Sequence, residues 1–128
     1  MRILGIDFGL KKIGFSLATT DLAEPLNVIR FEDEKEVLIK IVSLVNQEKI
    51  EKIVVGLSEG ETAIKTRAFV NSLQPLVNIP IELTDETLST QTAQDLAIEA
   101  GIGRDKRKRL EDAFAATVML QSYLDRHV

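Results

Sequence analysis

The sequence predicts a single α/β domain in which helices cover both faces of a mixed five-stranded sheet. Three strand-like apolar segments follow one another at the start of the chain, and helix-like and strand-like segments then alternate. Residues 113–121 carry no charge, as expected of a helix that packs against a sheet. The 128 residues contain no repeat, linker or low-complexity segment, which favours one domain over residues 1–128.

The first third of the chain predicts a β-meander followed by a helix. Residues 2–8 form a buried strand, residues 9–12 a turn, and residues 13–18 and 26–31 the second and third strands. Asp33 is suited to cap the helix that follows, because its side chain can accept a bond from a free backbone N–H. The apolar positions of that helix recur at helical spacing and are Val37, Leu38, Ile41, Leu44 and Val45.

The rest of the chain alternates between strands and helices. The apolar β-branched run 52–57 predicts a central strand, and a loop at 58–61 leads into a helix over about 62–76. A fifth strand is expected at 81–84. Two further helices are expected at about 89–100 and 107–126, with two glycines in the connection between them.

Composition narrows the chemistry that this chain can perform. It has no cysteine and a single histidine, His127, which excludes a thiolate zinc site and a buried Ser-His-Asp triad. No uncharged run approaches the ~20 apolar residues that span a bilayer. Met1 leads directly into an apolar strand, so we expect no signal peptide and a cytoplasmic location. Any catalysis must therefore rely on carboxylates, hydroxyls, Lys, Arg and Tyr123.

Asp7 is the first candidate catalytic acid. It ends a buried strand, where a carboxylate is costly to desolvate unless it is paired or bound to a metal ion. The alternative is that Asp7 only caps the turn, accepting N–H bonds from Gly9 or Leu10.

Glu86 is the second candidate, at the carboxyl end of a predicted strand, where α/β sheets place their sites. Asp85 beside it is a plausible accessory ligand. The alternative is that this acidic pair only complements the dipole of the next helix, for which Ser89 is a suitable cap.

Asp112 is the third candidate. It shares the inner face of the last helix with Ala116 and Tyr123 by helical spacing. Glu111 is the competing acid, and Asp112 could instead pair with Arg109 or Lys108.

These three acids come from a first strand, a later strand end and the last helix, and such segments can converge at one end of a sheet. Converging carboxylates repel one another unless cations neutralise them. Their hard oxygen atoms favour Mg²⁺ or Mn²⁺, and two such ions would clamp the attacking water and the leaving oxygen of a phosphodiester.

Basic residues predict a nucleic-acid partner although the net charge is −4. Five of the six residues at 104–109 are basic, and a local patch can bind phosphate on an acidic chain. The expected contacts to the sugar–phosphate backbone are Lys11, Lys12, Arg67, Lys106, Arg107, Lys108 and Arg109. The alternative for the basic run is a solvated helix start.

Four motifs in order resemble the YqgF family over essentially the whole chain. They are Gly5-Ile6-Asp7-Phe8-Gly9 with Lys11-Lys12-Ile13-Gly14, Val54-Val55-Gly56-Leu57, Thr84-Asp85-Glu86-Thr87-Leu88-Ser89-Thr90, and Asp112-Ala113-Phe114-Ala115-Ala116 with Leu120-Gln121-Ser122-Tyr123-Leu124. This family is described as Holliday junction resolvases with a ribonuclease H-like fold, and as the nuclease that matures the 5′ end of pre-16S ribosomal RNA. The resemblance implies Asp7, Glu86 and Asp112 as the catalytic acids.

Two departures from the family pattern concern the expected substrate surface. Thr87 stands where the family usually has Arg, and Thr cannot hold a phosphate bidentately. The acidic loop 58–61 replaces a longer segment. Both departures concern the choice of substrate and the efficiency of cleavage more than the fold.

Other functions stay open from the sequence alone. The chain could be a non-catalytic nucleic-acid-binding relative of the same fold, which Thr87 and the loop 58–61 would explain. The motif at 5–9 also resembles the phosphate loop of actin-like phosphotransferases, but those bind nucleotide between two such domains. Structured RNA and branched DNA are both candidate substrates. A resolvase would act as a homodimer, to which the apolar helix 113–124 could contribute.

Overall fold

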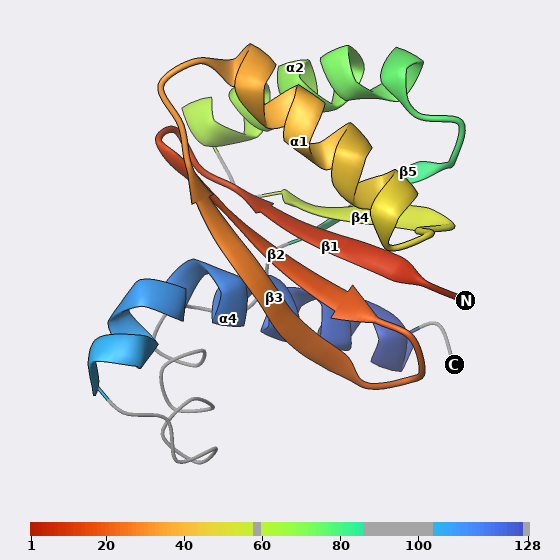
Figure 1. Cartoon of the computed structure of the whole chain (residues 1–128), viewed down its shortest axis with the longest axis vertical. Coiled ribbons are helices and arrows are strands. Elements are labelled where there is room, and N and C mark those ends of the chain that lie inside the picture. The colour runs from red at the N-terminus through yellow and green to blue at the C-terminus, as the bar shows by residue number, and fades with distance from the viewer. Residues whose placement is uncertain (58–59, 86–103, 127–128) are drawn as a thin grey trace.

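The computed structural model describes residues 1–57, 60–85 and 104–126; for residues 104–112 it describes the backbone alone. Five strands form one mixed sheet in the order β3-β2-β1-β4-β5 (Figure 1). They are β1 (Ile3–Phe8), β2 (Lys12–Ala18), β3 (Ala23–Arg30), β4 (Lys52–Leu57) and β5 (Ile81–Asp85). The β1–β2 and β2–β3 pairs are antiparallel, whereas β1–β4 and β4–β5 are parallel. The predicted mixed five-stranded sheet is confirmed.

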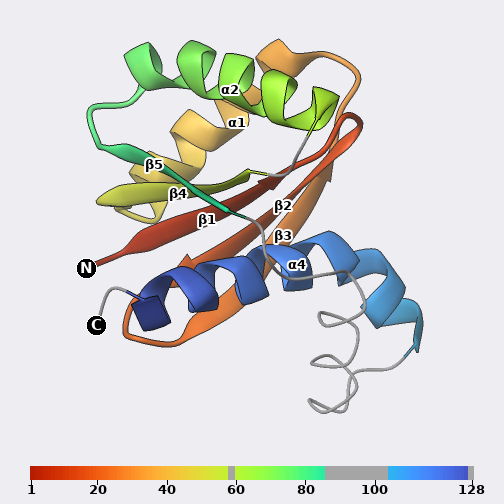
Figure 2. The same cartoon turned by 180° about the vertical axis from the view of Figure 1, so that it is seen from behind.

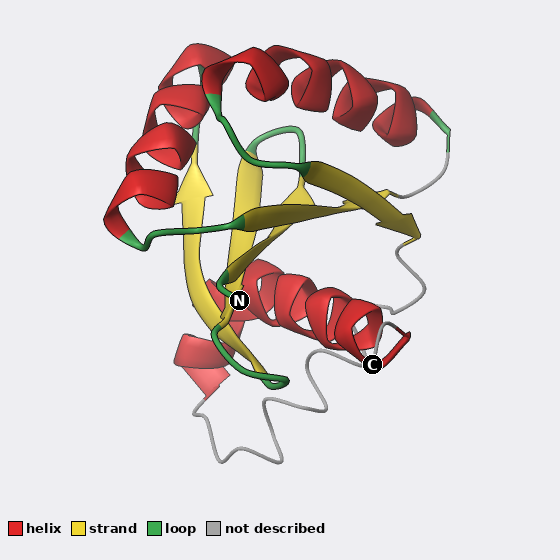
Figure 3. Ribbon diagram, turned by 90° about the vertical axis from the view of Figure 1, so that its right-hand side faces the viewer, coloured by secondary structure: helices red, strands yellow, loops and turns green. Residues whose placement is uncertain are grey.

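Helices cover both faces of this sheet. They are α1 (Glu34–Gln47), α2 (Glu61–Leu73) with the short 3₁₀ turn η1 (Gln74–Leu76), and α4 (Arg104–Arg126). The α1 and α2 helices lie on one face and α4 lies on the other (Figures 2 and 3). Within the described residues, no helix is long and apolar enough to cross a membrane.

The alternation of β1 divides its side chains between two cores. Leu4, Ile6 and Phe8 face α1 and α2 in the larger core, where Phe8 stacks on Phe69 with ring centroids 4.6 Å apart. Ile3 and every second residue after it in β1 face α4. Met119, Leu120 and Tyr123 of that helix fill the smaller core. Asp7 has the same parity as Ile3 and therefore belongs to the α4 face.

The predicted capping of α1 is confirmed. Asp33 Oδ1 accepts a hydrogen bond from the backbone N–H of Lys35 at 3.0 Å. Val37, Ile41 and Val45 are buried, while Leu38 and Leu44 pack at the margin of the same core. The inner face of this helix is therefore the one that helical spacing indicates.

Three predicted boundaries are corrected by the structure. The third strand begins at Ala23 rather than residue 26, and it includes Pro25, which an edge strand tolerates because one side of its backbone needs no ladder donor. The helix predicted over 62–76 ends at Leu73 and continues as η1, because Pro75 lacks the N–H that an α-helix needs. The last helix begins at Arg104, three residues before its predicted start. The helix predicted at 89–100 lies outside the described residues.

Candidate active site

Asp7 lies one residue before the carboxyl end of β1, the middle strand of the sheet, and it is half-buried. Its partners in register are Gly14 on β2 and Gly56 on β4, and Gly56 in turn pairs with Thr84 on β5. These four paired residues form one row across the sheet, called the Asp7 row. Because glycine has no side chain, no side chain from β2 or β4 flanks the Asp7 carboxylate within this row. On the face of the sheet to which Asp7 belongs, side chains near its carboxylate can therefore come from α4 and from the segments around the end of the sheet.

The docking of α4 fixes which part of that helix approaches Asp7. Ser16 Oγ on β2 donates a hydrogen bond of 2.9 Å to the carbonyl oxygen of Ala116. Leu120 packs over Gly5 so closely that a Cβ on Gly5 would lie 3.1 Å from the Leu120 Cβ. Gly5 and Ser16 are paired in register. The stretch from 116 to 120 therefore covers the row of residues that precedes the Asp7 row.

Asp112 occupies a backbone position one helical turn before Ala116. The opposite end of α4 is held at the other end of the sheet, since Tyr123 contacts Lys52 at the start of β4 and Glu82 near the start of β5. Moving back along α4 therefore leads toward the end of the sheet where Asp7 lies. Four helical residues span about 6 Å, close to the two-residue step of about 6.6 Å along β1 from Gly5 to Asp7. The Asp112 side chain itself lies outside the described part.

The β5 strand brings the chain to the same edge of the sheet. It ends at Asp85, which pairs with Leu57 of β4 and is exposed. Glu86 follows directly in the chain but lies outside the described residues. Among the residues that the structure does describe, no three acidic, histidine or cysteine side chains are grouped so that they could hold a metal ion. Of the three predicted acids, the side chain of Asp7 alone falls within this description.

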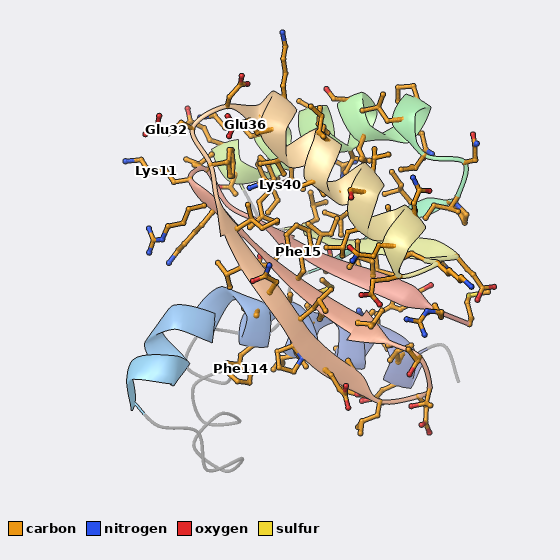
Figure 4. The ribbon with its side chains drawn as sticks, viewed as in Figure 1. Lys11, Phe15, Glu32, Glu36, Lys40 and Phe114 are labelled. Atoms are coloured by element: carbon orange, nitrogen blue, oxygen red, sulfur yellow. The ribbon has the colours of Figure 1, made fainter. Side chains whose placement is uncertain are left out.

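The predicted basic contacts lie in three places. Lys11 and Lys12 lie at the β1–β2 hairpin, at the same end of the sheet as Asp7, and Lys11 projects from its tip (Figure 4). Arg67 is exposed on α2 and lines a hollow at the end of β5. Lys106, Arg107, Lys108 and Arg109 lie on the first turns of α4, and their side chains fall outside the description.

Two further arginines lie beside these positions and were missed by sequence reasoning. Arg30 ends β3 and pairs in register with Lys12. Arg126 ends α4, and its guanidinium donates a 2.7 Å hydrogen bond to Thr84 Oγ1. Neither arginine belongs to a basic run in the sequence. The register of β3 and the docking of α4 bring them to these places, and local sequence patterns do not contain such long-range features.

A polar cluster joins α4 to the β4–β5 edge. Lys52 Nζ lies 2.6 Å from a Glu82 carboxylate oxygen, and the Tyr123 hydroxyl donates a 2.6 Å hydrogen bond to that oxygen and contacts Lys52. The bond to Glu82 is the main cause that raises the pKa of Lys52, whereas burial is the main cause that raises the pKa of Tyr123. Both groups therefore hold their protons over the physiological range, as expected of a structural cluster.

The fold of this chain resembles that of two proteins solved in complex with Holliday junctions. It aligns with the structure titled as fowlpox virus resolvase in complex with Holliday junction DNA at a TM-score of 0.69 and 13% identity, covering 100% of this chain and 99% of that one. It aligns with Thermus thermophilus RuvC in complex with a Holliday junction substrate at a TM-score of 0.66 and 18% identity, covering 99% and 95%. At such identities the likeness shows the fold, which is ribonuclease H-like.

Sequence comparison shows the family. Residues 1–126 match the family described as RuvX, Holliday junction resolvase, and this chain belongs to it. A relative from Pelotomaculum thermopropionicum, named "Putative pre-16S rRNA nuclease", is 41% identical over 98% of this chain and 87% of its own length. A relative from Bacillus cytotoxicus with the same name is 37% identical over 98% of both chains. RuvX is another name for the YqgF family, so the family expected from the four motifs is confirmed.

Proposed function

We propose that this chain is a single-domain nuclease that hydrolyses phosphodiester bonds in nucleic acid at the end of the sheet marked by Asp7. One observation carries the proposal. Asp7 is a half-buried carboxylate at the end of the central strand, flanked in its row by two glycines, and α4 is docked with Asp112 one turn closer to that row than Ala116. Membership of a resolvase family and the names of the relatives support the same chemistry.

The proposed ligands for divalent metal ions are Asp7, Glu86 and Asp112. The donor set fits, because carboxylate oxygens are the ligands that Mg²⁺ and Mn²⁺ prefer, and neither cysteine nor a second histidine is present to favour another metal. Two bound ions would supply charge neutralisation and an activated water. The chain's own part is to hold Asp7 rigidly, since β1 is hydrogen-bonded to strands on both sides.

The proposed substrate is structured RNA at the 5′ end of pre-16S rRNA, with four-way DNA junctions as the second candidate. The names of the relatives at 35–41% identity favour RNA, whereas the family description favours the junction. Junction resolution needs two copies of the site, so that role also requires a homodimer. Both proposed substrates are found in the bacterial cytoplasm, so we propose that this chain acts there.

The test is cleavage of matched substrates with Mg²⁺ or Mn²⁺. The panel contains an RNA with a structured rRNA-like end, a four-way DNA junction and linear duplex DNA. We expect Asp7→Asn to lower the rate by at least about 100-fold, the scale on which loss of one charge-stabilising group acts in a preorganised site. Asp21→Asn is the matched control, because Asp21 is exposed in the β2–β3 turn at the opposite end of the sheet.

The outcomes separate the alternatives. Cleavage that Asp7→Asn abolishes and Asp21→Asn preserves would establish the nuclease, and the preferred substrate would assign RNA processing or junction resolution. Nucleic-acid binding with no metal-dependent cleavage of any substrate would instead identify a non-catalytic relative.

A further inference from the structure

A hollow of about 450 Å³ lies at the end of β5, between that strand, α2 and the last turn of α4. Its lining includes two guanidinium groups, Arg67 from α2 and Arg126 from α4, together with Thr84 and Asp85 of β5. Both arginines are exposed. Three separate elements thus bring basic and hydroxyl groups to one concave place, of which the sequence predicts Arg67 alone as a contact to the substrate backbone.

The hollow lies beside the row that contains Asp7. Thr84 occupies that row, two strands away from Asp7 through Gly56. Neighbouring strands are about 4.8 Å apart, so the step from Asp7 to Thr84 is roughly 10 Å. Stacked nucleotides advance about 3.4 Å each along a strand, so roughly three of them span this step. A nucleic-acid strand whose scissile phosphate lies at Asp7 can therefore reach the hollow.

The charge of the lining favours an anion. Glu82 lines the hollow but is already paired with Lys52, whose Nζ lies 2.6 Å from its carboxylate. Asp85 is then the acid that opposes two guanidinium groups within the described lining. The excess of positive charge suits a phosphate, for which the planar arginine fork is the preferred side chain.

The contact between Arg126 and Thr84 positions one of these forks. Its Nη2 donates a 2.7 Å hydrogen bond to Thr84 Oγ1. A guanidinium has five N–H donors, so this bond leaves enough of them to hold a phosphate bidentately. A fork that is already oriented loses less side-chain entropy when it binds.

We infer that Arg67 and Arg126 form a phosphate-binding subsite that holds the substrate backbone a few nucleotides away from the scissile bond. This inference rests on the proposed nuclease function, because it takes Asp7 as the position of the cut. The ligand is the phosphodiester that RNA and DNA share. In this role Arg126 contacts the substrate and not the proposed catalytic acids. Its loss should therefore weaken substrate binding more than it slows the cleavage step.

The test measures binding by the full chain carrying Asp7→Asn, which stops turnover. Fluorescence anisotropy with single-stranded RNA and DNA 12-mers of the same sequence is recorded over a series of salt concentrations. We expect Arg67→Gln and Arg126→Gln each to weaken binding several-fold for both probes. Each should also lower the slope of log affinity against log salt by about 0.7, the value for one phosphate contact on a single strand.

Lys65→Gln is the matched control. Lys65 is exposed on the same helix two residues before Arg67, does not line the hollow, and lies on another face, because residues two apart on a helix do not face each other. If Arg126→Gln fails to fold through loss of the Thr84 bond, Arg67→Gln alone carries the test. Thermal melts of all variants check folding.

Three results would overturn the subsite. Affinity and salt slope of both arginine variants could equal those of Lys65→Gln. The loss could appear with RNA alone, which would point to the sugar hydroxyl and not to phosphate. The third result concerns probes shortened from each end in turn. A true subsite stops contributing to affinity once the shortened strand no longer reaches it, so the same loss of affinity in the arginine variants at every probe length would contradict the subsite. The nuclease proposal fails separately, when Asp7→Asn cleaves like the wild type.

Discussion

Gly5 shows at the level of single residues how closely α4 approaches the sheet. A Cβ at this position would lie 2.2 Å from Ser16 Oγ and 3.1 Å from the Leu120 Cβ. Real Cβ atoms are not found at the first of these distances, so a side chain at residue 5 has to displace the Ser16 hydroxyl. That hydroxyl holds Ala116 by a hydrogen bond of 2.9 Å. The missing side chain at Gly5 therefore permits the docking that brings the first turns of α4 toward the end of the sheet where Asp7 lies.

We predict that Gly5→Ala lowers the free energy of unfolding by about 1–3 kcal/mol, the usual cost of overpacking a core. Ser16→Ala alone should cost about 1 kcal/mol for the lost hydrogen bond. The double variant should cost less than the sum, because removal of Oγ removes the main obstacle to the new methyl group. Urea unfolding of the four proteins checks this, and strict additivity would contradict the stated cause.

The Lys52, Glu82 and Tyr123 cluster predicts an alkaline limit to stability. The pKa values of Lys52 and Tyr123 lie above their ordinary values of 10.5 and 10.0. A group whose pKa is raised by folding contributes stability that is present below its ordinary pKa and is lost as the pH rises through the folded value. The cluster should therefore be intact at neutral pH and should weaken from about pH 10 upward.

Tyr123→Phe tests this limit. We expect the wild type to lose more of its urea midpoint between pH 8 and pH 11 than Tyr123→Phe loses, because the variant has no phenol to ionise. The Glu82 bond, which is the main cause of the raised pKa of Lys52, stays in both proteins, so the difference reports mainly the tyrosine. A wild-type midpoint that falls no faster than that of the variant would show that the raised pKa of Tyr123 makes no contribution.

At the level of whole elements, Gln121 of α4 explains where β3 begins. Its side-chain oxygen accepts a 2.8 Å hydrogen bond from the backbone N–H of Ala23, and its nitrogen donates to the Asp21 carbonyl oxygen at 3.0 Å. The strand starts at Ala23 because a residue nearly 100 positions later satisfies its first donor. Apolar patterning within residues 23–31 contains no trace of that partner, so the predicted start was three residues late.

We predict that Gln121→Ala frays the start of β3 and leaves most of the sheet intact. The Ala23 amide proton should exchange with solvent at least about 5-fold faster, because the lost bond is worth about 1 kcal/mol. Amide exchange followed by NMR measures this, with the Phe15 amide in the neighbouring strand as an internal reference. Faster exchange at Ala23 and Phe15 alike would show global destabilisation and not local fraying.

At the scale of the whole molecule, the mixed five-stranded sheet was predictable from the sequence because the signals of its strands and helices are local. The run at 52–57 is apolar and β-branched, and the inner face of α1 follows from the spacing of Val37, Ile41 and Val45. The candidate site was only partly accessible. Asp7 could be placed at a strand end, but the glycines beside it come from β2 and β4, and Arg126 reaches Thr84 only after α4 has docked.

The proposed convergence of Asp7, Glu86 and Asp112 predicts that divalent ions stabilise the fold. Carboxylates that meet at one sheet end repel one another, and a cation bound only by the folded chain removes that repulsion and adds binding free energy. At a metal concentration 100 times the dissociation constant, the gain is about 2.7 kcal/mol. Mg²⁺ or Mn²⁺ should therefore raise the melting temperature of the wild type by several degrees, with no substrate present.

Comparison of the wild type with Asp7→Asn tests whether the stabilising ions bind at Asp7. The variant removes one proposed ligand and one negative charge, so its melting temperature should rise less than that of the wild type when metal is added. Asp21→Asn should behave as the wild type does, because Asp21 lies in the turn at the far end of the sheet. Equal metal-induced shifts in all three proteins would place cation binding elsewhere and would remove Asp7 from the proposed metal site, whatever substrate the nuclease cleaves.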